Sequence, residues 1–272
     1  MTPSTQVLPT GITALKSHAG SSRLATPIVL AVGLVLFAVN LWRNRFFLHD
    51  DAFISLRYAQ NFADAGDLSW NLGDRVEGYT NFLYVLITSA LLKAGIDPVV
   101  AVRLINGVAV VLLVWAVFAG ARALYPQRPE AAALGIALIL GNVSVSVWLL
   151  GGLEAPLAAA FVAGAMAFVI SAIVIPADAP LPYRTLSLAG VAFALAVLTR
   201  PDGVIIVAAT FFALLVAAPF AWKHRLIGAA IVAGIPFVVF MIHLGWRVSY
   251  YGDVLPNTFH AKVGLDLALR LE

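Results

Sequence analysis

The segment FFLHDDAFISLRYAQNFADAGDLSWNLGDRVEGYTNFLYV, residues Phe46–Val85, is a polar stretch in a chain that is otherwise apolar. It carries six of the fourteen acidic residues of the protein. The whole chain is 61% hydrophobic and 11% charged, with a mean hydropathy of +0.94. A soluble domain has roughly 45–50% apolar and about 25% charged residues. The composition therefore predicts an integral membrane protein, with the lipid bilayer as a partner.

The apolar runs on either side of this segment indicate helices. Several are long enough to cross a bilayer as a helix, which takes roughly 20 apolar residues, and they do not alternate in polarity as membrane β-strands do. We therefore expect an all-α polytopic membrane protein. The absence of cysteine excludes disulfides and thiolate metal sites. The net charge of +3 is scattered between the apolar runs, which indicates membrane topology and no nucleic-acid partner.

Eight runs are candidates for spanning helices: 24–42, 80–95, 98–121, 131–150, 155–175, 185–199, 203–221 and 226–246. If all eight crossed the membrane from a cytoplasmic N-terminus, the basic loops at 121–130 and 222–225 would lie outside, against the positive-inside rule. The conflict disappears if the run 80–95, which directly follows the polar stretch, is an interfacial helix. The prediction is a module of about seven spanning helices plus an outer interfacial helix.

This topology divides the chain into three parts. Residues 1–23 form a cytoplasmic tail, residues 24–246 form the transmembrane module, and residues 247–272 form an extracytoplasmic segment. Within the module, residues 43–96 are the first extracytoplasmic loop with its interfacial helices. The first apolar run has no small-residue cleavage site behind it, so we expect a retained signal anchor.

Four polar clusters fall on the outer side in this topology. They are the segment 46–85, GGLEAPL at 151–157, LTRPDG at 198–203 and YYGDVLPNTFHAK at 250–262. Such convergence on one side of the membrane predicts a functional site at the extracytoplasmic surface.

Asp50 and Asp51 are the candidate catalytic residues. Their positions before an amphipathic segment fit a helix N-cap. They also fit a general base that acts on an acceptor hydroxyl, with the second carboxylate orienting the acceptor or binding a cation, because crowded carboxylates raise one pKa toward a useful range.

Basic residues supply candidate contacts to an anionic ligand. Arg57 either snorkels toward lipid headgroups or binds a phosphate. Arg200 stands before Pro201 at an outward-facing helix boundary, where it is placed to clamp a lipid phosphate. His260 and Lys262 are candidates for binding an anionic headgroup or a sugar.

Two glutamates lie where the chain re-enters the membrane. Glu77 precedes Gly78 and an aromatic residue, and Glu154 lies between two apolar runs. An ionisable residue at this depth suggests a functional role. Glutamate is also common at the start of a helix, which is a purely structural explanation. Both interpretations stay open.

Common soluble-enzyme motifs are missing from the chain. It has no phosphate-binding glycine loop, HExxH or nucleophile elbow. Nucleotide-activated sugars are cytoplasmic, so an outer site with gathered acidic residues favours a lipid-linked donor.

The segments HDDAFISLRYAQNFADAGDLSWNLGDRVEGYTNFLYV, GGLEAPL, LTRPDG and YYGDVLPNTFHAK, in this order, resemble the bacterial membrane glycosyltransferases of the GT-C fold. They are most similar to arabinofuranosyltransferase-related proteins of actinobacterial cell-wall synthesis. The similarity to protein O-mannosyltransferases and to the aminoarabinose transferases of lipid A is more distant.

The resemblance implies transfer of a sugar, with arabinofuranose one candidate, from a polyprenyl-phosphate donor to a cell-envelope glycan outside a bacterial plasma membrane. It implies an inverting mechanism in which Asp50 or Asp51 is the base, and Asp50, which leads the pair, is the favoured one. The expected donor-binding residues are Arg57, Glu77, Tyr79, Asn81, Glu154, Arg200, His260 and Lys262. The need for a divalent cation stays open, and Asp51 and Glu154 are the expected ligands if one takes part.

The alternative function is non-catalytic, either a transporter of lipid-linked sugars or a scaffold in an envelope complex. A transporter should carry polar residues at mid-membrane depth on several helices, whereas the apolar runs hold few. Relatives of the GT-C fold are usually longer, so an inactive fragment of a longer enzyme is a further alternative.

Overall fold

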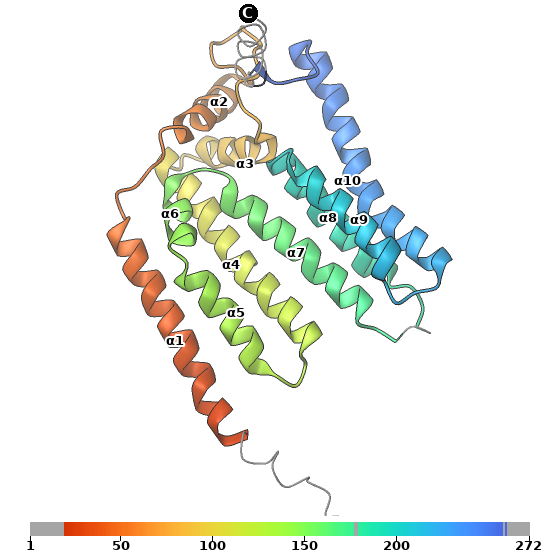
Figure 1. Ribbon diagram of the computed structural model, residues 1–272. Helices are drawn as coiled ribbons and strands as arrows, with labels where there is room; N and C mark the ends of the chain where they lie inside the picture. The colour runs from red at the N-terminus through yellow and green to blue at the C-terminus, as the bar shows by residue number, and fades with distance from the viewer. Residues whose placement is uncertain (1–18, 177–178, 258, 260–272) are drawn as a thin grey trace, which may run out of the picture.

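The structure is a computed structural model that describes residues 19–176, 179–257 and 259 (Figure 1). Within these residues the chain forms helices and no strand, apart from an isolated bridge between Asn71 and Asp74. The helices are α1 (Ala19–Arg43), α2 (Ala52–Ala65), α3 (Phe82–Lys93), α4 (Pro98–Leu124), α5 (Pro129–Gly141), α6 (Val143–Gly151), α7 (Ala155–Ile173), α8 (Tyr183–Thr199), α9 (Gly203–Ala217) and α10 (Trp222–Tyr251).

Four of these helices, α1, α4, α7 and α10, are long and apolar enough to cross a membrane. The pair α5 and α6 makes a fifth crossing if the two are counted as one bent span. The apolar helices α8 and α9 are shorter, with 17 and 15 residues. The prediction of an all-helical chain with membrane-spanning character is confirmed at this level.

The predicted run 131–150 is divided into two helices with an angle of 55° between them. Asn142 causes the break, because its backbone is extended (φ −74°, ψ 122°) and its side-chain oxygen accepts a hydrogen bond from the Ser144 amide at 2.9 Å. An asparagine that caps the next helix interrupts the hydrogen bonds of the preceding one. Mean hydropathy does not detect this interruption, so the sequence predicted a single helix.

The long helices lie side by side, and α2 and α3 lie across one end of them (Figure 1). We call this end the capped end. The connections that follow α4, α7 and α9 lie at the opposite end, together with the basic residues Arg122, Arg128, Arg184, Lys223 and Arg225. This charge distribution is the one on which the predicted topology was based.

Helix α3 occupies the run that was predicted to be interfacial. Its 12 residues extend about 18 Å, which is well short of a hydrocarbon core of about 30 Å. Tyr84 and Val85 are fully buried against the other helices. The helix therefore packs on the protein and does not run beside the long helices.

Packing between the long helices uses small residues. A Cβ atom on Gly33 of α1 would lie only 2.6 Å from Cα of Ala137 in α5, and one on Gly190 of α8 would lie 3.0 Å from the Ile231 oxygen in α10. Such close approach is typical of helices that associate in lipid. Many large apolar side chains face outward, for example Val35, which is 61% exposed on α1, as expected for surfaces in contact with acyl chains.

Candidate functional site

A polar network at the capped end joins three residues that are far apart in the sequence. Glu154 Oε2 accepts a hydrogen bond from the Asn81 amide at 2.9 Å, and Glu154 Oε1 accepts one from Arg200 Nη1 at 3.1 Å. Asn81 also donates to Ser55 Oγ at 2.9 Å. The network therefore connects α2, the start of α3, the α6–α7 junction and the α8–α9 junction. Three of the predicted donor-binding residues meet here.

Arg200 lies between two carboxylates. Its Nε and Nη2 atoms donate to Asp202 at 3.1 and 3.0 Å, and its Nη1 atom donates to Glu154. The hydrogen bonds from Arg200 hold the pKa of Asp202 below its usual value. The three groups carry a formal net charge of −1. A phosphate can bind here only if Arg200 releases a carboxylate or if a cation joins the group.

Local sequence explains why these side chains are free to meet. Gly152 adopts a left-handed conformation (φ +78°) that ends α6, and Glu154 occupies the N-cap position of α7 without a side-chain capping bond. Arg200 is in an extended conformation after α8, and Asp202 precedes α9, again without a capping bond. Both junctions therefore leave their carboxylates available for Arg200.

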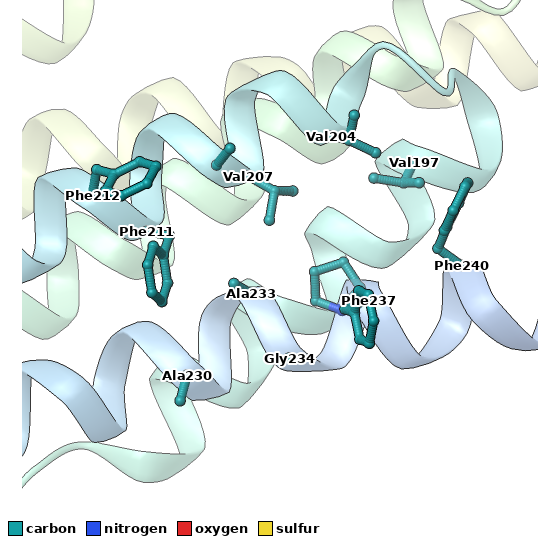
Figure 2. A pocket seen from close by; sticks show the side chains of 12 residues that line it. Val197, Val204, Val207, Phe211, Phe212, Ala230, Ala233, Gly234, Phe237 and Phe240 are labelled. Carbon is teal, nitrogen blue, oxygen red and sulfur yellow. The ribbon is translucent and has the colours of Figure 1, made fainter.

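Two apolar cavities lie beside this network. The first, of about 290 Å³, is lined by α7, α8 and α9, with Arg200 and Asp202 among alanine, valine, glycine and isoleucine residues. The second, of about 520 Å³, lies between α8, α9 and α10 and is wholly apolar. Figure 2 shows Phe211 of α9 and Phe237 of α10 beside this second space. The charged side chains of Arg200 and Asp202 therefore lie at the α8–α9 junction, next to apolar cavities between the same helices and their neighbours.

Asp50 and Asp51 lie in the loop between α1 and α2 and are exposed, with 93% and 65% of their side chains accessible. Asp51 occupies the N-cap position of α2, yet its side chain makes no capping hydrogen bond. The His49 amide donates to the Gly151 oxygen at 3.0 Å, which ties this loop to the junction that carries Glu154. Among the described residues, no hydrogen bond or ion pair joins either aspartate to Glu154.

His49, Asp50 and Asp51 form one group of candidate metal ligands, with ligand atoms within 4.8 Å of one another. Asp51 thus has two further ligand atoms beside it. Glu154, the other predicted cation ligand, is not in this group and bonds instead to Asn81 and Arg200. A cation at this group would be held by one half-buried and two exposed side chains.

Glu77 forms a buried ion pair with Arg247 of α10. The distance from Arg247 Nε to Glu77 Oε2 is 2.8 Å, Nη2 donates to Oε1 at 3.1 Å, and the two side chains are 9% and 3% exposed, respectively. Burial raises the pKa of Glu77, and the Arg247 guanidinium opposes the rise. Tyr79 is also buried, and its hydroxyl lies 3.1 Å from that of Tyr251. In this arrangement Glu77 and Tyr79 anchor the α2–α3 loop to α10.

The other predicted donor-binding residues have different surroundings. Arg57 is exposed, and its Nε donates to the Trp70 oxygen at 3.1 Å, so it borders the α2–α3 loop. His260 and Lys262 lie outside the described residues.

Sequence reasoning missed Arg247, His49 and Asp67. Asp67 accepts hydrogen bonds from the Gly73 amide and the Tyr250 hydroxyl, both at 2.7 Å, and these hold its pKa below the usual value. Arg247 was detectable, because an arginine in an apolar helix requires a partner. The identity of that partner depends on how α10 packs.

Comparison of the chain with protein-family models, curated proteins and solved structures gives no match in any of the three.

Proposed function

We propose that this protein is a membrane glycosyltransferase that takes a sugar from a polyprenyl-phosphate donor and passes it to a cell-envelope glycan. In this proposal about seven helices span a bacterial plasma membrane in a GT-C-like arrangement, with α8 and α9 as spans, α3 at the outer interface and the capped end extracytoplasmic. Arabinofuranose is the candidate sugar, as the sequence resemblance implies.

The observation that carries the proposal is the position of Arg200. Its guanidinium lines a cavity between α7, α8 and α9 whose other walls are almost entirely apolar, and a second apolar cavity begins one turn away at Val197 and Val204. A polyprenyl phosphate needs a cation beside its phosphate and apolar space for its chain. Arg200, once it releases Asp202, and these cavities would meet both requirements.

The two exposed aspartates supply the base. In the proposed reaction, Asp50 or Asp51 removes the proton of an acceptor hydroxyl as its oxygen bonds to the anomeric carbon, and the bond from that carbon to the phosphate oxygen breaks. Configuration inverts, and polyprenyl phosphate leaves with the bonding electrons. Arg200 stabilises the charge on the leaving phosphate as it turns from Asp202 toward the phosphate. A divalent cation, if one takes part, would bind at His49, Asp50 and Asp51 and supply further positive charge.

A direct test is transfer of radiolabelled sugar from a panel of polyprenyl-phosphate donors in membranes with matched amounts of wild type, Asp50→Asn, Asp51→Asn and Arg200→Lys. We expect one donor to be consumed by the wild type. At least one aspartate variant should lose transfer and retain donor binding. Arg200→Lys should lower kcat/KM about 10- to 100-fold, because lysine replaces several charge-assisted hydrogen bonds with a point charge.

Asp64→Asn is the matched control, because Asp64 is an exposed aspartate on α2 whose side chain, among the residues that the structure describes, accepts a hydrogen bond from Gln60 alone. It should transfer at the wild-type rate. If the wild type binds a donor and transfers nothing, the catalytic proposal is rejected in favour of the scaffold or transporter alternative.

A further inference from the structure

A second candidate ligand site lies away from the network of Asn81, Glu154 and Arg200, on the exposed face of α4. A groove of about 540 Å³ follows this face and is lined mainly by Val100, Arg103, Leu104, Gly107, Val108 and Val111. We call it the α4 groove. Leu104, Val108 and Val111 are 49%, 58% and 68% exposed, so the groove opens to the surroundings of a helix that is long and apolar enough to span the membrane.

Gly107 borders open space in the groove. A Cβ atom at this position would meet no other atom within 4 Å, so the glycine leaves space and does not serve close helix packing. Gly33 and Gly190 differ in this respect, since there a neighbouring helix comes within 3.0 Å of the added atom.

Arg103 places a positive charge at one end of the α4 groove. Its Nη2 donates to the backbone oxygens of Arg45 and Phe47, both at 3.2 Å. Within the part of the chain that the structure describes, Arg103 has no carboxylate partner, and its Nε is buried without a hydrogen bond. The guanidinium charge at the edge of an apolar groove is thus uncompensated by the protein.

The Arg103 end of the groove lies near the start of α4. Arg103 is the sixth residue of α4, about 8 Å from the start of the helix, a depth at which arginine reaches the interface. The backbone oxygen of Arg45 accepts a hydrogen bond from Arg103, and the guanidinium of Arg45 lies 4.2 Å from the ring of Trp42 at the end of α1. Tryptophan and arginine together are typical of the membrane boundary.

We propose that the α4 groove binds an anionic glycerophospholipid of the surrounding bilayer. The phosphate lies beside Arg103, and one acyl chain follows Leu104, Gly107 and Val108. Charge complementarity selects this occupant, because a neutral partner would leave the Arg103 charge uncompensated in an apolar setting. Since Arg103 also holds the two carbonyls that precede His49, a lipid bound here contacts the residue that supports the loop of Asp50 and Asp51.

The test is native mass spectrometry of the purified full chain in detergent, titrated with phosphatidylglycerol or with phosphatidylcholine. The wild type should bind one phosphatidylglycerol about fivefold more tightly than phosphatidylcholine, the effect of about one arginine at a membrane surface. Arg103→Gln should remove this preference. Gly107→Leu, which fills the groove and leaves Arg103 in place, should weaken the binding of both lipids at least about fivefold, as loss of a buried acyl segment requires.

Gly245→Leu is the matched control, because Gly245 is an exposed glycine of α10 whose added Cβ would also meet nothing within 4 Å. It should bind phosphatidylglycerol as the wild type does. Equal binding of the two lipids by the wild type would overturn the proposal. Unchanged binding by Gly107→Leu would also overturn it, whether or not Arg103→Gln folds. These lipid-binding measurements do not depend on transferase activity, so they can fail or succeed independently of the proposed function.

Discussion

Arg247 and Glu77 illustrate how single charges are accommodated in this protein. Both side chains are nearly inaccessible, and each removes the electrostatic penalty of the other through two short contacts. A buried pair adds little net stability compared with apolar residues, but removal of one partner leaves an unpaired buried charge. Docking of the α2–α3 loop onto α10 therefore requires that this ion pair forms, because otherwise one charge is buried without its partner.

This gives a prediction for unfolding in detergent. Arg247→Met should lower the free energy of unfolding by about 3–5 kcal/mol, because Glu77 is left buried without its partner. The double variant Glu77→Leu with Arg247→Met should recover much of that loss. Arg122→Met, at an exposed arginine, is the control and should change stability by less than about 0.5 kcal/mol. Additive losses in the double variant would contradict the pairing.

At the scale of elements, the α2–α3 loop is held to the end of α10 by hydrogen bonds. The Leu68 amide donates to the Tyr250 hydroxyl at 3.0 Å, and the Tyr251 hydroxyl donates to the Leu68 oxygen at 2.7 Å. Asp67 adds the bonds with Gly73 and Tyr250 described above. The end of α10 therefore shares in ordering this loop with α2, whose Arg57 and Asn61 side chains donate hydrogen bonds to the Trp70 oxygen.

The depressed pKa of Asp67 makes this docking dependent on pH. The stabilising effect is fully present above the unfolded-state pKa, near the ordinary value of 3.8, and is lost as the pH falls through the lower pKa of the folded state. Hydrogen exchange of the 66–76 segment, corrected for intrinsic rates, should therefore accelerate between pH 5 and about pH 3.

Asp67→Asn should exchange faster than the wild type at pH 5 and change little further on acidification. Asp64→Asn should behave as the wild type does. Equal pH responses in wild type and Asp67→Asn would assign the effect to another group.

At the scale of the whole molecule, the polar network lies at the capped end, and the connections that follow α4, α7 and α9, with Arg122, Arg128, Arg184, Lys223 and Arg225, lie at the opposite end (Figure 1). Helices α8 and α9 extend about 26 and 23 Å, so each needs its flanking residues to cross a core of about 30 Å. Arg200 and the loop of Asp50 and Asp51 both lie at the capped end, so the proposed chemistry requires α8 and α9 to reach that side of the membrane.

Cysteine labelling tests this arrangement cleanly, because the chain has no cysteine of its own. A membrane-impermeant maleimide applied to intact spheroplasts should label Asn71→Cys and Pro201→Cys. Gln127→Cys and Lys223→Cys should react only after permeabilisation. Failure of Pro201→Cys to react before permeabilisation, with Asn71→Cys labelled, would mean that α8 and α9 do not cross to that side.

The amino-acid sequence by itself determined the membrane class, the helical elements and the polar segments at their ends, because these follow from composition and from apolar run length. It also identified Asn81, Glu154 and Arg200 as separate candidates. Their meeting was decided by tertiary structure, since the start of α3, the α6–α7 junction and the α8–α9 junction converge only when α3, α7 and α8 are packed together. The same holds for Arg247 and Glu77, which are 170 residues apart. Asn142 divides a run that hydropathy treats as continuous. Its capping effect depends on one side chain and the local backbone, and a hydropathy average over a window does not contain that information.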